Sequence, residues 1–362
     1  MSDHQDETSS RWTRTRLGRT VHADSDEHVR VVLRTLGIDE MVWAATLDHY
    51  AATVQPGDSL NDRLEALGDA FRKASPRLLV PDLATSVCPA CAALAMKPCV
   101  ARRSPSAPIV YGRCEACGHG QLVAGAAPPT IYESDAYFRN RGLDGTGYDA
   151  YEAERTYREA KGDGLLDWLE QFLEPPLREP SLLEVGSGFG FTRQAAAMRG
   201  FRTGGVDLNP FAARAARQLY GFDTVTGTLG AALDSGAIAK HSWNIVLYQF
   251  VLEHIPDPAL ELRRAAEAVA PGGYVVFVAP SMATFEIDLF GAAYRSLRAD
   301  HFHLFSIASA RAYVHGAKLT EVAHKTTCSL HLLKGFVEPG ELDELYARDR
   351  GPDLFFMSRS AG

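Results

Sequence analysis

Hydrophobic and polar positions follow two different patterns along the chain. Between residues 25 and 80, apolar side chains recur at the three- or four-residue spacing of helices, which predicts a small helical domain. From residue 181 onward, short apolar runs alternate with amphipathic segments, which is typical of an α/β fold with a parallel sheet and helices on both faces. The expected strands are 181–185, 202–207, 222–226, 243–248 and 274–279, and the expected helices are 190–199, 210–219, 229–239 and 258–270.

Further segments extend this outline. The helical domain should contain helices at 29–36, 41–52 and 60–71, and 151–172 should form a lead-in helix before the first strand. Near the end of the chain, the apolar segments 314–322 and 354–357 are expected to close the sheet as antiparallel strands.

The third helix of the N-terminal region has two candidate N-caps, Asp58 and Ser59. The sequence Gly57-Asp58-Ser59-Leu60 also resembles the site at which carrier proteins bear a phosphopantetheine arm. Because the same residues form an ordinary N-cap, we favour the cap.

A glycine-rich turn lies between the first strand of the α/β region and its helix. Glycines at 186, 188 and 190 lack Cβ atoms and tolerate positive φ, so a ligand can approach the main chain closely. The dinucleotide pattern G-x-G-x-x-G would need a glycine where Phe191 stands, so that fingerprint fails. Asp207 ends the second strand, where a carboxylate can accept both ribose hydroxyls of an adenosine.

Several motifs in order carry a resemblance to a known family. Glu184–Gly190 is similar to the E-x-G-x-G-x-G loop of class I, Rossmann-like methyltransferases, which use S-adenosylmethionine (SAM). Trp243–Pro258 resembles the fourth-strand signature of this family with its Leu-Glu-His ending, and Ala270–Tyr274 resembles its Pro-Gly-Gly turn. The resemblance implies a seven-stranded, mostly parallel sheet with helices on both faces, and SAM as cofactor. It places cofactor contacts at Glu184, Gly186, Ser187, Gly188, Gly190, Asp207, Leu208, Thr228, Gln249, Tyr148 and Tyr151. Thr228 departs from the family, which often has an aspartate there.

Paired cysteines form a second candidate site. Cys88 and Cys91 make one C-x-x-C knuckle, and Cys114 and Cys117 make another. Four thiolates with this spacing favour a closed, structural zinc site, and buried free thiols are the alternative. Cys99 lies between the knuckles and is the substitute ligand if one of the four is not used.

These patterns divide the chain into five expected parts. They are a disordered tail (1–24), a helical N-terminal domain (25–80), a zinc ribbon (81–128), an aromatic flap with a lead-in helix (129–180) and the methyltransferase core (181–362). The flap resembles a segment that covers the cofactor in methyltransferases with an N-terminal zinc ribbon. Tyr148 and Tyr151 either cover the cofactor in this way or pack the helix onto the sheet.

Composition narrows the possible partners. The net charge of −8 disfavours a long nucleic-acid surface, although a basic ribbon face formed by Lys97, Arg102, Arg103 and Arg113 would favour RNA. No apolar run approaches the roughly 20 residues of a membrane span. The polar N-terminus has no secretory signal, so we expect a cytoplasmic protein with a small-molecule substrate. The sequence does not indicate the oligomeric state.

Histidines near the expected methyl position are the candidate bases. An oxygen nucleophile of high pKa needs a base, and His254 follows the fourth strand with Glu253 as its neighbour. The alternative is that His254 only anchors its loop. His301 and His303 are the next candidates. They alternate on an extended segment, so they are expected to share a face, for a structural or substrate-contact role rather than a metal site.

The favoured function is methyl transfer from SAM to a small molecule, through an oxygen of a specialised metabolite. The ribbon, flap and core together also resemble sugar C-methyltransferases. The helical region 25–80 and the Leu-Glu-His ending separate the chain from those sugar enzymes. Two more functions stay open: an RNA or protein methyltransferase that uses the ribbon for recognition, and a non-catalytic partner subunit.

Overall fold

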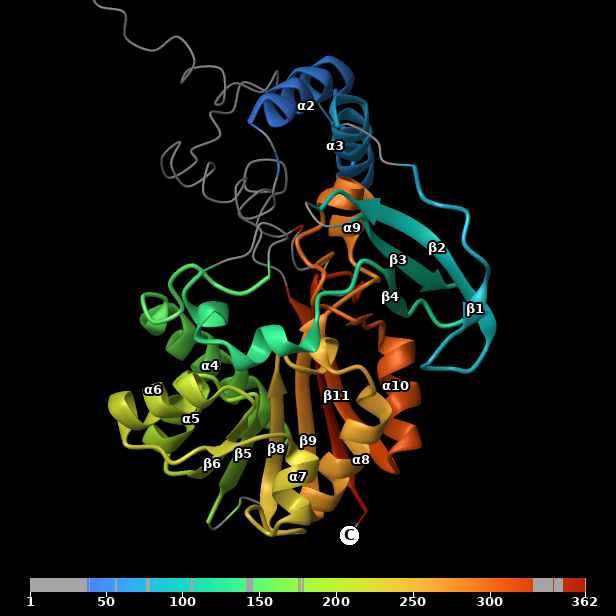
Figure 1. Cartoon of the computed structure of the whole chain (residues 1–362). Helices are drawn as coiled ribbons and strands as arrows, with labels where there is room; N and C mark the ends of the chain where they lie inside the picture. The colour runs from blue at the N-terminus through green and yellow to red at the C-terminus, as the bar shows by residue number, and fades with distance from the viewer. Residues whose placement is uncertain are drawn as a thin grey trace, which may run out of the picture.

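A computed structural model describes most of the chain (Figure 1). It covers residues 38, 40–55, 57–75, 79–104, 107–140, 146–174, 177, 179–327, 341 and 348–361. The expected tail at 1–24 and the expected helix at 29–36 lie outside these residues. Within the described part, no helix is both long enough and apolar enough to cross a membrane.

The larger sheet of the described residues has seven strands in the order β11-β12-β9-β8-β5-β6-β7. Strands β9, β8, β5, β6 and β7 run parallel, and β12 and β11 add antiparallel at one edge. The bounds are β5 Ser181–Val185, β6 Arg202–Asp207, β7 Val225–Thr226, β8 Trp243–Gln249, β9 Val269–Pro280, β11 Leu319–Thr327 and β12 Asp353–Ser360. The predicted fold class is therefore confirmed.

Helices cover both faces of this sheet (Figure 1). Helices α4 and α5 pack on one face through one buried apolar cluster, and α7, α8 and α10 pack on the other through a second. Their bounds are α4 Arg155–Leu169, α5 Phe191–Met198, α6 Pro210–Tyr220, α7 Leu229–Asp234, α8 Pro258–Ala268 and α10 Ile307–Gly316. Helix α6 begins where sequence rules place it, because Pro210 stands at its start and the Asn209 side chain accepts its first free amides.

Several predicted boundaries were wrong, among them that of the strand expected at 222–226, which spans only Val225–Thr226. The helix expected at 229–239 ends at Asp234, and Gly236 follows it with φ +74° in the turn that leads away. The strand expected at 314–322 starts only at Leu319, because α10 continues to Gly316 and Lys318 makes the turn with φ +59°. The strand expected at 274–279 is longer and begins at Val269.

The ribbon forms a smaller, antiparallel sheet with the order β1-β2-β3-β4-β10. Four of its strands come from the region around the cysteines, but the fifth, β10, comes from the far end of the catalytic region. The bounds are β1 Ser86–Val87, β2 Leu94–Arg102, β3 Ile109–Cys114, β4 Gly120–Ala124 and β10 His303–Leu304. The ribbon is thus fastened to the core by a shared strand, which the sequence pattern did not predict.

The N-terminal helices α2 (Glu40–Thr53) and α3 (Leu60–Ala74) pack on α9 (Phe285–Phe290) in one apolar cluster. Ser59 caps α3 with a capping box, which confirms the expected N-cap. Short 3-10 helices complete the structure: η2 Pro129–Glu133, η3 Asp135–Phe138, η4 Glu170–Phe172, η5 Leu252–His254 and η6 Gly291–Ala293.

Candidate functional site

The glycine loop joins β5 to α5 at the carboxyl edge of the parallel strands, where ligands of such sheets bind. Gly186, Gly188 and Gly190 all have positive φ, at +67°, +52° and +83°. A Cβ atom on Gly186 would lie 2.4 Å from a methyl of Val251, and one on Gly188 would lie 2.8 Å from the hydroxyl oxygen of Tyr151. Both the backbone conformation and the close neighbours therefore require glycine.

Asp207 ties the end of β6 to this loop. One carboxylate oxygen accepts the Gly188 amide at 2.7 Å, and the other accepts the Asn209 amide at 2.8 Å. Burial raises the pKa of Asp207, and the two amides oppose that rise. The carboxylate is thus held in one orientation beside the loop, as a ribose contact would require.

Glu184 lies at the end of β5 with an unsatisfied atom. Its side chain is buried, and Oε2 has no hydrogen-bond partner among the described residues. Burial raises the pKa of Glu184 to about 8, although Arg193 and Thr192 act to lower it. A buried carboxylate oxygen without a partner is costly, so Oε2 could pair with a cationic ligand group.

Aromatic residues of the flap cover the glycine loop. The ring of Tyr151 lies 5.0 Å from that of Phe189 and 5.3 Å from that of Phe191. Tyr148 contacts Tyr151 at 4.8 Å between ring centroids and packs in the same cluster. Of the two predicted flap tyrosines, Tyr151 is therefore the one that rests directly on the loop.

The remaining predicted cofactor residues are spread along the same edge. The Thr192 hydroxyl donates to Gln249 Oε1 at 2.5 Å, which places Gln249 beside the glycine helix. The Thr228 hydroxyl accepts the Ala231 amide and caps α7. Leu208 is exposed, and the Ser187 hydroxyl is buried without a partner in the described part of the chain.

A histidine cluster lies just beyond β8. His254 Nδ1 is 2.7 Å from the Asp300 carbonyl oxygen and 2.9 Å from the Tyr132 hydroxyl. The ring of His301 meets that of His254 edge to face, with centroids 4.7 Å apart, and His301 Nδ1 is 2.9 Å from the Ser296 carbonyl oxygen. His254 and His301 thus share one site, and each uses Nδ1 to bind the protein.

Burial favours the neutral form of both histidines in this cluster. Burial lowers the pKa of His254 and holds that of His301 well below its usual value, while the Asp300 carboxylate opposes both shifts. Arg298 binds Asp300 with two bonds of 2.8 Å and helps to hold the pKa of Asp300, which burial would raise, at about 2. Burial raises the pKa of Glu253 well above its usual value.

Ligand-type atoms of Glu253, His254 and His301 lie within 4.8 Å of one another, so these side chains could hold a divalent cation. Sequence reasoning missed three residues that shape this site, Tyr132, Arg298 and Asp300. The signals were present but weak, because Asp300 adjoins His301 and Tyr132 begins the aromatic segment.

His303 does not belong to this cluster. Its Nδ1 lies 3.1 Å from Nε2 of His119 in the ribbon, and its Nε2 lies 3.2 Å from the Pro256 carbonyl oxygen. The expectation that His301 and His303 share a face was wrong, because β10 begins at His303 and turns that side chain toward the ribbon. His303 therefore has no direct contact with His254 that would make it a second base.

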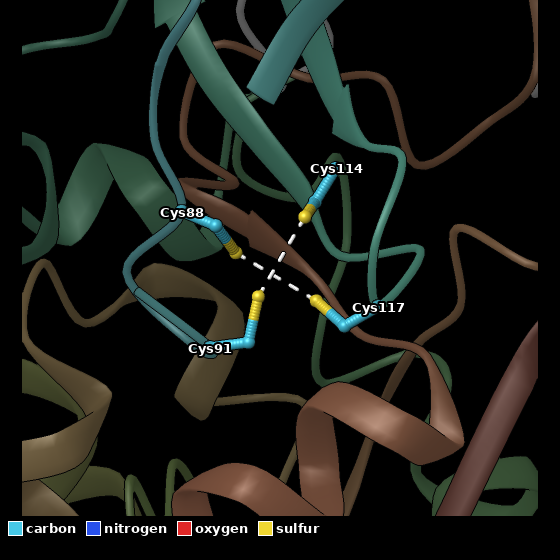
Figure 2. A group of neighbouring side chains, drawn as sticks. All are labelled: Cys88, Cys91, Cys114 and Cys117. Carbon is cyan, nitrogen blue, oxygen red and sulfur yellow. Dashed lines mark hydrogen bonds between the residues drawn. The ribbon is translucent and has the colours of Figure 1, made fainter. Parts of the chain in front are cut away.

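The four knuckle cysteines converge on one point (Figure 2). The sulfur atoms of Cys88 and Cys117 are 3.7 Å apart, and so are those of Cys91 and Cys114. In a tetrahedral site with Zn–S bonds of about 2.3 Å, sulfur pairs lie roughly 3.8 Å apart, so the four residues fit a zinc ion. Cys99 is outside this group, with its sulfur 3.5 Å from the Tyr111 carbonyl oxygen.

Comparisons with known proteins agree with this geometry. Residues 151–324 match the family model described as a methyltransferase domain. The chain is 28% identical over 200 residues to a ubiquinone biosynthesis O-methyltransferase of Hydrogenovibrio crunogenus, covering 54% of this chain and 70% of that protein. Residues 151–324 of this protein form a class I, SAM-dependent methyltransferase domain.

The methyltransferase is also 33% identical over 120 residues to a ubiquinone biosynthesis O-methyltransferase of Ralstonia nicotianae, covering 31% of this chain and 47% of that relative. Among solved structures, it is similar to a SAM-dependent methyltransferase from Mesorhizobium loti. That similarity has 19% identity and a TM-score of 0.42, and it covers 55% of this chain and 99% of that one. The two curated relatives match only 54% and 31% of this chain, so their substrates do not transfer directly to this methyltransferase.

Proposed function

We propose that this methyltransferase transfers a methyl group from SAM to an oxygen of a small molecule, within specialised metabolism. The observation that carries the proposal is the neutral His254, which stands beyond β8 with Nδ1 held by the Asp300 carbonyl oxygen. Relatives named as O-methyltransferases support oxygen as the acceptor atom. That residues 151–324 form a methyltransferase domain does not depend on this proposal.

In this proposal His254 accepts the proton of the acceptor hydroxyl. Because Asp300 O can only accept, His254 Nδ1 carries the hydrogen, and the lone pair is on Nε2. SAM supplies a methyl group on a sulfonium, which is already a good leaving group. The acceptor oxygen forms a bond to the methyl carbon as the carbon–sulfur bond breaks, and its proton goes to His254 Nε2. The Asp300 carboxylate, 3.7 Å from His254, stabilises the imidazolium that results.

The site also limits which acceptors fit. The Tyr132 hydroxyl lies 2.9 Å from both His254 Nδ1 and the Asp300 carbonyl oxygen, so it holds the base in place from the flap side. A buried base surrounded by aromatic rings and neutral histidines suits a compact, uncharged hydroxyl compound. Sugar C-methylation is the alternative, so the acceptor atom must be tested directly.

The described cations of the ribbon argue against the basic face that an RNA substrate needs. Lys97 pairs with the exposed Glu115, and the Arg102 guanidinium donates to the Leu297 carbonyl oxygen of the core. Arg103 and Arg113 are exposed, but two cations give a small electrostatic footprint. This arrangement favours a small-molecule acceptor over RNA.

For the ribbon we propose a structural zinc ion held by Cys88, Cys91, Cys114 and Cys117. The sulfur spacing supports it, and backbone amides of Cys117 and Ala116 lower the pKa of Cys114 to about 7, against the effect of burial. A thiol that ionises near neutral pH binds zinc readily. All four positions are filled by protein, so this zinc would not act on substrate.

The test is transfer of labelled methyl from SAM with a cell extract as acceptor, followed by separation into small molecules, RNA and protein. Label in the small-molecule fraction, lost in His254→Asn but kept in the exposed-surface control Asp223→Asn, is the expected result. Label in RNA or protein would overturn the small-molecule proposal, and full transfer by His254→Asn would overturn the assignment of the base.

A further inference from the structure

The segment that carries Asp300 and His301 is built into the ribbon sheet. Strand β10 pairs antiparallel with β4, with His303 opposite Gln121 and Leu304 opposite Gly120. Just before it, the Leu122 amide donates to the Phe302 carbonyl oxygen at 3.0 Å. The backbone of the histidine site is therefore held by ribbon strands as well as by β9 of the larger sheet, whose Pro280 carbonyl oxygen accepts the Phe305 amide at 2.9 Å.

Tyr111 of the ribbon fixes both sides of Asp300. It lies on β3 and is buried, and its hydroxyl is 2.9 Å from the Arg298 carbonyl oxygen and 2.5 Å from that of His301. Both partners are acceptors, so the single hydroxyl proton is shared between them. Asp300 stands between these two residues, and its own carbonyl oxygen orients His254.

His119 of the ribbon fixes the next part of the segment. Since the Pro256 carbonyl oxygen can only accept, His303 Nε2 carries a hydrogen and donates to it. Burial lowers the pKa of His303 to about 4, so its Nδ1 is an acceptor at neutral pH. His119 Nε2 must then donate to His303 Nδ1, across 3.1 Å. The tautomers of both histidines follow from this chain of bonds.

The chain of bonds ends in the loop that carries the base. Pro256 lies two residues after His254, and the Phe302 amide donates to the Glu253 carbonyl oxygen at 2.7 Å. The loop after β8 is thus held at Glu253 and at Pro256. Both bonds come from the segment 302–303, which Tyr111 and His119 support. No bond in this chain passes through the glycine loop or Asp207.

We propose that Tyr111 and His119 are positioning residues for methyl transfer. In this role the ribbon holds the base His254 in its orientation, rather than binding a macromolecular substrate. Tyr111 fixes the position of the Asp300 carbonyl oxygen, which orients His254. His119 fixes the position of the loop after β8 through His303. The inference rests on the proposed role of His254 as the base. It predicts that the two ribbon residues control the tautomer of His254 without affecting cofactor binding.

Tyr111→Phe is the sharpest variant, because it removes one oxygen atom and keeps the ring that packs in the apolar cluster beneath β3. His119→Leu removes the donor to His303, and His119→Gln restores a nitrogen donor near the Nε2 position. Lys97→Gln is the matched ribbon control, since that side chain is exposed and its ion pair is with the exposed Glu115.

The first readout does not need an acceptor. In the full-length protein labelled with [15N]histidine, the His254 signal is identified by its loss in His254→Asn and is followed against pH. Tyr111→Phe and His119→Leu should shift its titration and mix its tautomers, His119→Gln should largely restore them, and Lys97→Gln should change nothing. Affinity for S-adenosylhomocysteine should stay within about twofold in all four variants.

The second readout is kinetic, with the acceptor fraction found in the labelling experiment. Tyr111→Phe should lower kcat by about 10- to 100-fold and leave the KM for SAM unchanged, because a small displacement of the base affects only the chemical step. Unchanged His254 signals in both Tyr111→Phe and His119→Leu would overturn the inference. So would an equal loss of cofactor affinity, which would indicate general unfolding. If the product carries the new methyl group on carbon or nitrogen, the proposal of an oxygen acceptor is refuted. The His254 signals would still test whether Tyr111 and His119 position His254.

Discussion

Replacing Asp207 with asparagine should weaken both the cofactor site and the fold. The carboxylate accepts the Gly188 amide with one oxygen and the Asn209 amide with the other. Asparagine has a single side-chain oxygen, so its NH2 group must face one of these amide donors. A buried donor left without an acceptor costs about 1–3 kcal/mol. For a domain of this size, each kcal/mol lowers Tm by about 2–4 °C, so a loss of about 2–12 °C is expected.

The same change should also reduce the affinity for the cofactor. A hydrogen bond from a ribose hydroxyl to a charged carboxylate contributes about 1.5–3 kcal/mol. Its loss corresponds to roughly 10- to 150-fold weaker binding. The assay is calorimetric titration with S-adenosylhomocysteine at pH 8, because burial raises the pKa of Asp207 and a higher pH favours its ionised form.

Asp223→Asn is the matched control for this experiment. Its side chain is 83% exposed and pairs with an Arg217 that is 73% exposed, so the pair contributes little. If Asp207→Asn binds S-adenosylhomocysteine within twofold of the native protein, the assignment of Asp207 to the ribose is wrong. If its Tm is also unchanged, the argument about the two amide donors fails as well.

Three further predictions concern Glu184, His254 and Cys91. Glu184, with a pKa of about 8, is mostly protonated at pH 7 in the free protein, and a cationic amino group favours its ionised form. Binding of S-adenosylhomocysteine should therefore release about one proton at pH 7 and tighten from pH 6 to 8. Calorimetry in buffers of different ionisation enthalpy checks this, and Glu184→Gln should abolish the release. His254→Asn should lower kcat about 10²- to 10⁴-fold with unchanged cofactor affinity. Because burial lowers the pKa of His254, the midpoint of the acid-side fall in native kcat should lie below pH 6.5, and a midpoint above that would count against this base. Cys91→Ser should lose most of the zinc, about one ion per native chain by elemental analysis, whereas native protein without zinc would exclude the site.

The sequence was most informative where chemistry and local pattern coincide. The strands around the glycine loop could be predicted because each apolar run is followed directly by a glycine turn or a carboxylate. Asp207 and the four cysteines could be named because their neighbours in the chain define their positions. These features depend on contacts over a few residues, or on a spacing that is typical of few kinds of site.

The sequence was least informative where distant segments meet. Strand β10 is only two residues long, so it has no periodicity that could predict its pairing with the ribbon. The contact between Tyr132 and His254 joins residues far apart in the chain, and His303 gained a ribbon partner that no local pattern indicates. The end of α7 was predicted too late because helical propensity continues past Asp234, whereas the helix ends at the turn that contains Gly236.

The product of the reaction tests the central claim most directly. The full-length methyltransferase would be supplied with SAM carrying a 13C-labelled methyl group and with the acceptor fraction, and the product would be examined by carbon NMR. A methyl group bound to oxygen, absent when His254→Asn replaces the native protein, is the predicted result. A methyl group bound to carbon or nitrogen, or a product formed equally well without His254, would contradict the proposal.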